Sequence, residues 1–318
     1  MSDAAIFRRR FEALAANVED FIRGKPEVVR LALVCLLAEG HLLIEDVPGV
    51  AKTSLAKAIA RSVAGAEVKR IQFTPDLLPS DVTGVQVYDQ GRSRFEFRQG
   101  PVFTNILLGD EINRASPKTQ SALLEVMAEG QVTVDGRPIP VPYPFLCIAT
   151  QNPVEHQGTY ALPEAQLDRF MMRISIGYPE NLADEVSILA YGVTRRRPDE
   201  LKSVMELDDL RLMIRAVREQ RVADTLREYV ARLVRATRVH PDVELGVSPR
   251  GGIALVTAAQ AYALAAGRPY VTADDVKAVA VPVLNHRLLL TPEARIQQRT
   301  TESVLADVLT AAPVPAGR

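Results

Sequence analysis

The sequence contains little cysteine, and the few thiols it has do not form a metal or disulfide pattern. Only two cysteines occur in 318 residues, Cys35 and Cys147, and both lie inside apolar runs. Neither belongs to a pair with the spacing of a metal site. We therefore expect two buried free thiols, which is typical of a protein in a reducing compartment.

The sequence also lacks a long apolar run and an excess of charge of one sign. The longest apolar run, residues 31–38, is far shorter than the roughly twenty residues that span a bilayer. The first residues, "MSDAAIFRRRFEAL", contain no apolar signal core. The net charge of −1 provides no general attraction for nucleic acid or an anionic membrane. We therefore expect a cytoplasmic protein without a membrane span, and nucleic acid is not the expected partner.

What the sequence does contain is a series of short apolar segments that alternate with helical patterns. The composition, 47% hydrophobic and 24% charged, is that of a globular protein. Helical patterns cover 53–64 and 117–128, and strands are predicted at 41–45, 68–73, 105–110, 145–150 and 171–176. Alternation of this kind predicts an α/β fold with a parallel sheet covered on both faces.

Two segments interrupt this alternation, and the last part of the chain differs from the rest. Residues 85–99 and 130–141 alternate around the turns "DQGR" and "DGRP", so each is predicted to be a β-hairpin. After residue 180 we find only helical patterns and no strand. We predict an αβα core over residues 1–178, a linker region over 179–205 and a helical domain over 206–318.

The stretch "EDVPGVAKTS" follows the first predicted strand and opens a helix, as a phosphate-binding loop does. Lys52 would reach the β- and γ-phosphates, and the Thr53 hydroxyl would bind Mg²⁺. The outer glycines of the common motif are replaced by Asp46, at the neck of the loop, and Ala51. We expect Ala51 to have a negative φ, as the first residue of the helix. The expected nucleotide-binding residues are Asp46, Val47, Pro48, Gly49, Val50, Ala51, Lys52, Thr53 and Ser54.

Two adjacent acids end the apolar strand "NILLGDE". Buried carboxylates are costly unless they bind or act on a cation. Asp110 is therefore predicted to hold Mg²⁺, and Glu111 to be the general base that activates water. The alternative is a strand end that simply turns into solvent.

Together these motifs resemble the AAA+ ATPases and, within them, the MoxR family. The resemblance covers nearly the whole chain and rests on "EDVPGVAKT", "LLGDEINRASPKTQSALLEVMAEGQVTVDG", "CIATQNPVEHQGTYALPEAQLDRF" and "GVSPRGG". It implies a phosphate-loop αβα core with two hairpin inserts, followed by an all-α lid. It also implies a ring, commonly a hexamer, and a partner protein with a von Willebrand A-type domain.

The resemblance also implies roles for five further residues. Asn152 matches the first sensor, which would bind the γ-phosphate or the attacking water. Arg169 matches the arginine finger, which acts on ATP of the neighbouring subunit. Arg250 matches the second sensor, which would reach back from the lid to the γ-phosphate. Either arginine could instead form a surface salt bridge. Arg114 could be a second interface arginine, and Gln72 a switch residue that couples pore contacts to Glu111.

The predicted activity is Mg²⁺-dependent hydrolysis of ATP that drives remodelling of a protein client or insertion of a metal or cofactor into it. Three alternatives remain open at this point. They are a DNA-translocating motor, a motor subunit similar to that of magnesium chelatase, and a nucleotide-gated scaffold that does not hydrolyse ATP. The intact Glu111 opposes the scaffold, and the sparse charge of the 130–141 hairpin opposes the DNA motor.

Overall fold

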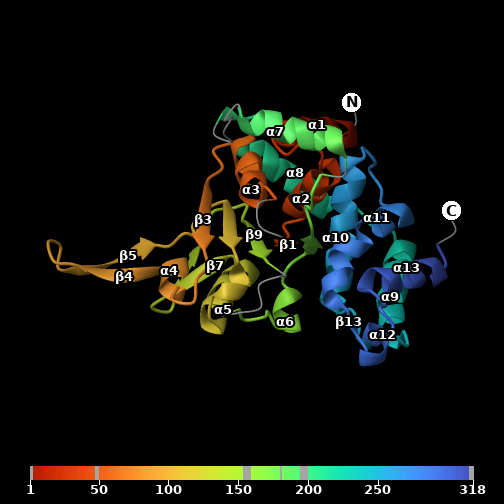
Figure 1. The fold of residues 1–318 in the computed structure, drawn as a ribbon. Coiled ribbons are helices and arrows are strands. Elements are labelled where there is room, and N and C mark those ends of the chain that lie inside the picture. Colours follow the sequence, from red (N-terminus) through yellow and green to blue (C-terminus); the bar gives the residue numbers. More distant parts are fainter. Residues whose placement is uncertain (1–2, 47–49, 153–158, 180, 194–199, 315–318) are drawn as a thin grey trace.

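The fold is built around a parallel sheet of five strands in the order β10-β1-β9-β6-β3 (Figure 1). The structure is a computed structural model that describes residues 3–46, 50–152, 159–179, 181–193 and 200–314. The strands are β1 (Leu42–Glu45), β3 (Val68–Gln72), β6 (Ile106–Asp110), β9 (Leu146–Gln151) and β10 (Met172–Ile174). Each overlaps a predicted apolar segment, with ends that differ by at most two residues, and the predicted α/β class is confirmed.

The two faces of the sheet are covered by different helices. Leu42 and Ile44 of β1 belong to one hydrophobic cluster and Leu43 to another, because successive side chains of a strand point to opposite faces. The first face carries α1 (Asp3–Glu19), α2 (Pro26–Leu37) and α3 (Lys52–Arg61). The second carries α4 (Pro79–Thr83) and α5 (Pro117–Glu129). The sheet is thus the middle layer of an αβα core.

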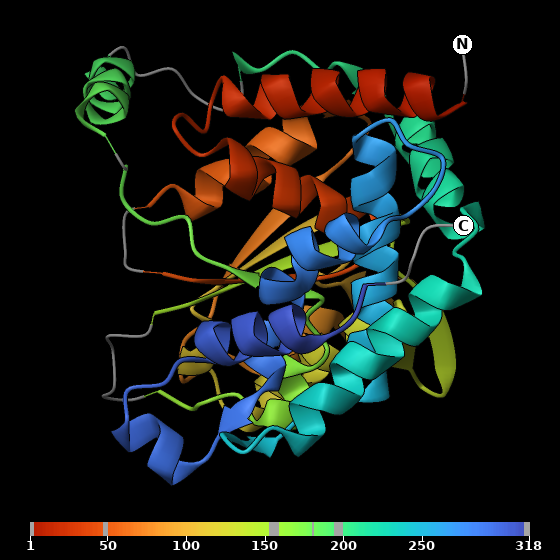
Figure 2. The same cartoon turned by 90° about the vertical axis from the view of Figure 1, so that its right-hand side faces the viewer.

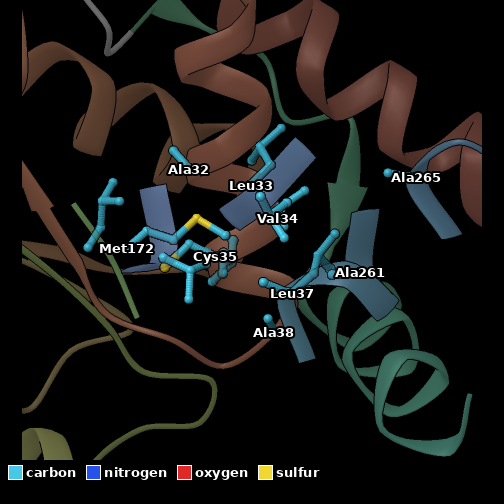
Figure 3. Packing of buried hydrophobic residues seen from close by; sticks show 14 of the residues in the cluster. Ala32, Leu33, Val34, Cys35, Leu37, Ala38, Met172, Ala261 and Ala265 are labelled. Atoms are coloured by element: carbon cyan, nitrogen blue, oxygen red, sulfur yellow. The ribbon is translucent and has the colours of Figure 1, made fainter. Parts of the chain in front are cut away.

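Helix α2 lies between the sheet and the helices of the second domain. Figure 3 shows its residues Leu33 and Cys35 among side chains from both sides, with Met172 of β10 on one side and Ala261 of α10 on the other. The small side chains of α10 let the two helices pack closely. Cys35 and Cys147 are both fully buried, as predicted, and burial raises the pKa of each thiol.

Both predicted hairpins are present. One consists of β4 (Gly84–Asp89) and β5 (Arg94–Gln99), and it extends away from the body of the molecule (Figure 1). The other consists of β7 (Gln131–Val134) and β8 (Arg137–Pro140). Its turn residues Asp135 and Gly136 both have positive φ, 48° and 75°, as the mirror-image turn of a tight hairpin requires.

The C-terminal helices form a lid beside the first face of the sheet (Figure 2). They are α8 (Leu207–Glu219), α9 (Asp224–Val239), α10 (Pro249–Ala265), α11 (Ala273–Leu284), α12 (Pro292–Ile296) and α13 (Thr301–Ala311). The short α6 (Glu164–Leu167) precedes β10, and α7 (Leu182–Val193) lies in the predicted linker region. Three-residue 3-10 helices span Ile112–Arg114 and Asn285–Arg287. Residues of the lid and of the αβα core share one hydrophobic cluster.

The prediction that no strand follows residue 180 is wrong. Strand β11 (Met205–Glu206) pairs with β2 (Val63–Ala64), and β12 (Val243–Leu245) pairs with β13 (Leu289–Leu290). Ladders of two or three residues form where backbones happen to approach, so they leave no periodic pattern in the sequence. Among the described residues, no helix is long and apolar enough to span a bilayer.

Candidate nucleotide-binding site

The predicted site residues of the core gather at the carboxyl edge of the sheet. Because the strands are parallel, their carboxyl ends lie side by side. Asp46 follows β1, Asn152 follows β9, Asp110 ends β6 and Gln72 ends β3. Asn152 is buried there, only 5% exposed. The first turn of α3 lies at this edge, and its backbone N–H groups favour binding of an anion.

The phosphate loop is described from Val50 onward, and Val47, Pro48 and Gly49 lie outside the described residues. Lys52, Thr53 and Ser54 form the first turn of α3. The Lys52 ammonium donates a hydrogen bond of 3.0 Å to the carbonyl of Asp46, so this side chain curls back across the loop. The cation is therefore held next to the residue that follows β1.

Asp46 serves the loop as an anchor. Its Oδ2 accepts hydrogen bonds from the backbone N–H groups of Ile176 and Gly177, at 2.7 and 2.8 Å, and from the Ser175 hydroxyl at 3.2 Å. The carboxylate is buried, 6% exposed. Asp46 thus ties the neck of the loop to the end of β10. Its inclusion among the nucleotide-binding residues stays a prediction, and the anchoring contacts stand beside it.

The expected backbone conformation of Ala51 is wrong. Ala51 is the residue before α3, with φ 60° and ψ 21°, which is the left-handed conformation. A residue with a Cβ atom pays roughly 1–2 kcal/mol for this conformation. Ala51 therefore belongs to the loop rather than to the first turn of the helix, at a position that glycine would occupy without strain.

Replacement of Ala51 by glycine is therefore expected to stabilise the protein, by roughly 0.5–1 kcal/mol after the greater freedom of glycine in the unfolded chain is subtracted. ATP affinity should stay within a few-fold, because the backbone conformation is kept. Urea denaturation measures the first effect and calorimetry the second. Ala306→Gly, on the exposed face of α13, is the matched control and should destabilise by about 1 kcal/mol. A loss of stability in both variants would contradict the left-handed conformation.

Asp110 is a buried carboxylate with a partner on each oxygen. Its Oδ1 accepts a hydrogen bond of 3.1 Å from the Thr150 hydroxyl, and its Oδ2 accepts one of 2.7 Å from Nε of Arg70. The Asp110 side chain is 10% exposed and that of Arg70 is 49% exposed. A cation from the chain itself thus lies on the carboxylate predicted to hold Mg²⁺.

Glu111 is held from two sides and has a strained backbone. Its φ is 57°, in the left-handed region, and its N–H donates to the Thr150 hydroxyl at 2.9 Å. Its Oε2 accepts a hydrogen bond of 2.7 Å from the Gln72 amide and lies 3.2 Å from Nε of Arg114. Gln72 therefore contacts the predicted base directly. Arg114, considered as an interface residue, pairs with Glu111 of its own chain.

Sequence reasoning did not identify Arg70 and Thr150. Arg70 and Gln72 are two residues apart on β3, so both side chains point to the same face, and Nη2 of Arg70 donates to Oε1 of Gln72 at 2.5 Å. The alternation in "VKRIQF" could have indicated Arg70 once Gln72 was chosen. Thr150 is the next-to-last residue of β9, and only the pairing of β9 with β6 brings it to Asp110.

The two predicted arginines that act on phosphate lie together at the other edge of the sheet. Arg169 and Arg250 both line a cavity of about 360 Å³, with residues 38–41 and Arg287. Residues 38–41 precede β1, whereas Asp46 follows it. The prediction that Arg250 reaches the phosphate loop of its own chain is therefore wrong, because the lid brings it to the amino edge of the sheet. We call this cavity the arginine pocket.

The positive charge of the arginine pocket comes from its arginines, because its histidine is neutral. His41 donates from Nε2 to the carbonyl of Met127 at 2.9 Å and accepts at Nδ1 from the Cys147 N–H at 3.1 Å. Burial lowers the pKa of His41 to about 4. Arg169 donates to the carbonyl of Leu124 at 2.5 Å, while Arg250 is exposed in the first turn of α10.

One carboxylate joins the arginine pocket to the lid. Asp168 accepts from Nε of Arg287 at 2.7 Å through Oδ1 and from the Ser248 hydroxyl at 3.0 Å through Oδ2. Burial lowers the pKa of Arg287, and its pairing with Asp168 opposes that effect. Ser248 also caps α10 by accepting from the Gly251 N–H. Asp168 thus fixes the start of α10 next to Arg169.

A larger cavity, of about 900 Å³, lies beside the neck of the phosphate loop. It is lined by residues 24–28 at the start of α2, by residues 173–176 at the end of β10 and by Pro282 and Asn285 of the lid. Ser175 and Ile176, which line it, are the residues that bind the Asp46 carboxylate. Cavities of 300–1,000 Å³ are the usual size of small-molecule sites. No pattern in residues 24–28 predicted this cavity.

Known proteins are similar to this chain over most of its length. Residues 41–172 match the model of the ATPase family associated with various cellular activities (AAA), and residues 235–308 match the AAA lid domain. Chaperone MoxR1 of Mycobacterium tuberculosis is 45% identical over 94% of this chain and 81% of its own length. YeaC of Bacillus subtilis is 50% identical over 93% of this chain and 92% of its own.

A solved structure is similar throughout. The crystal structure of a protein from Cytophaga hutchinsonii, described as an ATPase, superposes with a TM-score of 0.90 at 35% identity and covers 98% of this chain and 97% of that one. Magnesium-chelatase subunits are more distant; the homologue from Methanocaldococcus jannaschii is 25% identical over 72% of this chain and 60% of its own.

Proposed function

This chain belongs to the MoxR family of AAA ATPases, and we propose on that basis that it is a Mg²⁺-dependent ATP hydrolase that remodels a protein client. The observation that carries the proposal is the Glu111 carboxylate, held 2.7 Å from the Gln72 amide at the same sheet edge as the phosphate loop. In this reading Glu111 takes the proton of the attacking water. A protein that only bound nucleotide would not need this base.

Each of the other residues at this edge has a role that its chemistry supports. Lys52 neutralises the β- and γ-phosphates, and the N–H groups that open α3 donate to them. Asn152, buried at the end of β9, hydrogen-bonds the γ-phosphate or the water. Gln72 sets the orientation of the base and so links β3 to hydrolysis.

The residues present fit Mg²⁺. A buried carboxylate and a hydroxyl, from Asp110 and Thr53, are the hard oxygen ligands that this ion prefers. The Arg70 guanidinium on Asp110 supports the fit, because it shows that this carboxylate attracts a cation. When bound, Mg²⁺ neutralises phosphate charge that develops during the reaction. The Arg70 guanidinium on Oδ2 would compete with the ion for this carboxylate.

The adenosine part of ATP would lie in the 900 Å³ cavity beside the loop neck. Val28 and Leu31 give it apolar surface for a base, and Asn181 and Asn285 give it amides that can bind polar atoms of the base or ribose. Asp46 anchors the loop to the strand that borders this cavity. It would therefore keep the phosphate loop and the adenosine cavity at a fixed position relative to each other.

The arginine pocket completes a second chain's site. Arg169 and Arg250 lie at the amino edge of the sheet, across β1 from the phosphate loop. In a ring of identical subunits, commonly six in this family, that edge would meet the loop of the neighbour. Both arginines would then stabilise the γ-phosphate of the adjacent subunit during transfer.

A protein client is supported by the long hairpin β4–β5. Tyr88 and Phe95, 49% and 68% exposed, form an edge-to-face pair on it with ring centroids 5.2 Å apart. Arg92 and Arg94 both pair with Glu96, so part of the positive charge of the hairpin is neutralised beside the exposed aromatic pair. This favours a protein over DNA.

The relatives support a proposal for what the protein does to its client. MoxR1 is described as a chaperone, which supports remodelling, and the distant likeness to magnesium-chelatase subunits supports metal or cofactor insertion as its form. A partner with a von Willebrand A-type domain would select the client. The two buried thiols fit action in the cytoplasm.

The direct test is ATP binding by a Lys52→Ala variant. Removal of the ammonium from the phosphates should weaken ATP binding at least tenfold by calorimetry, with little change in thermal stability. Lys57→Ala, further along α3, is the matched control and should bind ATP normally. Normal affinity in the Lys52→Ala variant would refute the phosphate site.

Arg70→Ala tests the competition at Asp110. Without the guanidinium, less Mg²⁺ should be needed for half-maximal ATP binding, by about fivefold, since a partly exposed ion pair contributes up to roughly 1 kcal/mol. A titration of ATP binding against Mg²⁺ measures this shift. Arg92→Ala, on the hairpin, is the control and should change nothing. A higher Mg²⁺ requirement would mean that Arg70 helps to hold the phosphates.

A further inference from the structure

Helix α7 exposes an apolar face that nothing in the described chain covers. Leu182, Val186 and Leu189 are 75%, 55% and 65% exposed. Their spacings of four and three residues place them on one side of the helix. Figure 2 shows α7 apart from the other helices, at the upper left edge of the molecule. A stripe of three large aliphatic side chains in water indicates a contact surface.

The lid carries a groove of matching size between α9 and α10. The groove has a volume of about 530 Å³, and its surface is mostly apolar, with Val230 and Val234 of α9 and Val256 of α10 in its walls. Gly252 also lines the groove, and because it has no side chain the groove is deeper at this position. The α10 wall runs from Pro249 to Thr257, about 12 Å at 1.5 Å per residue, and the stripe on α7 spans about 10 Å.

The charges of the two surfaces are complementary. Three exposed arginines border the groove: Arg235, Arg227, which also pairs with Asp224 of its own helix, and Arg238, which also donates to the Val247 carbonyl. The sequence of α7, "LADEVSILAYGV", has two acids in its first turn and no basic residue. Of the two acids, Glu185 is exposed. A helix with this face would present its apolar stripe to the valines and its acids to the arginine border.

An α7 helix that occupies this groove has to come from another molecule. Asp184 of α7 lines the large cavity at the carboxyl edge, beside Gly24. The groove instead shares Ile253 and Thr257 with the arginine pocket at the amino edge. Figures 1 and 2 both show α7 far from α9. One molecule therefore carries the helix and the groove on different sides, which is a head-to-tail arrangement.

We propose that α7 of one subunit docks into the α9–α10 groove of the next copy of this chain. The proposal rests on the proposed function for its direction: the arginine pocket faces the neighbour's nucleotide, and α7 borders that same nucleotide cavity. The contact brings Leu182, Val186 and Leu189 onto Val230, Val234 and Ile253, and Glu185 onto the arginine border. It would place Arg169 and Arg250 at the neighbour's phosphates.

Disulfide crosslinking tests the contact. Cys35 and Cys147 are fully buried, so introduced cysteines will be the reactive ones. A chain with V186C and I253C, oxidised mildly with ATP and Mg²⁺ present, should form a ladder of covalent oligomers on a denaturing gel. The control pair, V186C with L212C on the exposed side of α8, should give no ladder. A dimer from V186C alone would reveal α7 packed against α7 and overturn the proposal.

A charge exchange gives a second test. R235E should weaken subunit association at least tenfold by analytical ultracentrifugation, and the double variant R235E/E185R should recover most of it. Circular dichroism checks that each variant is folded. Association unchanged in R235E, or not recovered in the double variant, would overturn the assigned charge pairing.

The same samples separate this proposal from the proposed function. If the ladder is missing while ATP binding remains dependent on Lys52, the docking is wrong and the nucleotide site stands. If no variant binds ATP, the proposed function fails whatever the ladder shows. Binding to phosphatidylserine vesicles that is lost in L189E, in the absence of a ladder, would assign α7 to a membrane instead.

Discussion

Replacement of Glu111 by glutamine is expected to slow ATP hydrolysis by roughly 10²–10⁴ and to leave Mg²⁺ and ATP binding unchanged. Glutamine keeps the size of the side chain and an oxygen that can accept from the Gln72 amide, which lies 2.7 Å from Oε2 in the wild type. It loses only the capacity to take a proton. Single-turnover kinetics with bound ATP measures the chemical step without product release.

Two further variants define what the result means. Asp110→Asn should weaken Mg²⁺-dependent binding, because Asp110, the proposed Mg²⁺ ligand and the partner of Arg70, loses its charge. Glu125→Gln, an exposed residue of α5, should do nothing. If Glu111→Gln hydrolysed ATP at the normal rate, the carboxylate would have only the structural role that its contacts with Arg114 and Thr150 give it.

Replacement of Arg169 by alanine should reduce turnover by roughly 10³–10⁵ while ATP binding stays close to normal. The physical reason is the distance between the arginine pocket and the phosphate loop, which lie at opposite edges of the sheet. In the proposed ring, loss of the guanidinium leaves the nucleotide site of its own chain intact and removes a positive charge from the transition state in the neighbouring subunit. Arg232→Ala, an exposed lid residue, controls for loss of an arginine in general.

Mixing Arg169→Ala with Lys52→Ala subunits should restore part of the activity. At an interface where an intact loop meets an intact Arg169 from the neighbour, every catalytic group is present. Native mass spectrometry has to show mixed rings first, because the rescue needs subunit exchange. If mixed rings form and no ratio restores turnover, Arg169 acts within its own chain or only as structure.

The sequence predicted the core of this fold well because each element has a local signal. Buried parallel strands appear as short apolar runs, so β1, β6 and β9 were found within a residue or so. The hairpin turn at Asp135 and Gly136 is equally local, since an Asp-Gly pair favours positive φ. The acids that end β6 were identified because charge at the end of a buried strand is costly without a purpose.

Features that depend on how distant segments meet could not be predicted in this way. Arg250 was assigned to its own loop because no local pattern tells at which edge of the sheet the lid will settle. Arg70 was missed because its role comes from its hydrogen bond to Asp110, which lies forty residues further along the chain on the neighbouring strand. Ala51 was misjudged because alanine is a good helix former, and the tertiary demand for a left-handed residue overrides that preference.

The link through Asp168 has a mechanical consequence. Asp168 is hydrogen-bonded to Arg287 and Ser248 of the lid, and the next residue in the chain is Arg169. A change in the tilt of the lid would therefore move the Arg169 side chain as well. In the proposed ring, load that tilts the lid of one subunit would withdraw the arginine from the ATP of the next. Mechanical load on one subunit would then delay ATP hydrolysis in its neighbour, and the subunits of the ring would hydrolyse ATP in sequence instead of at random.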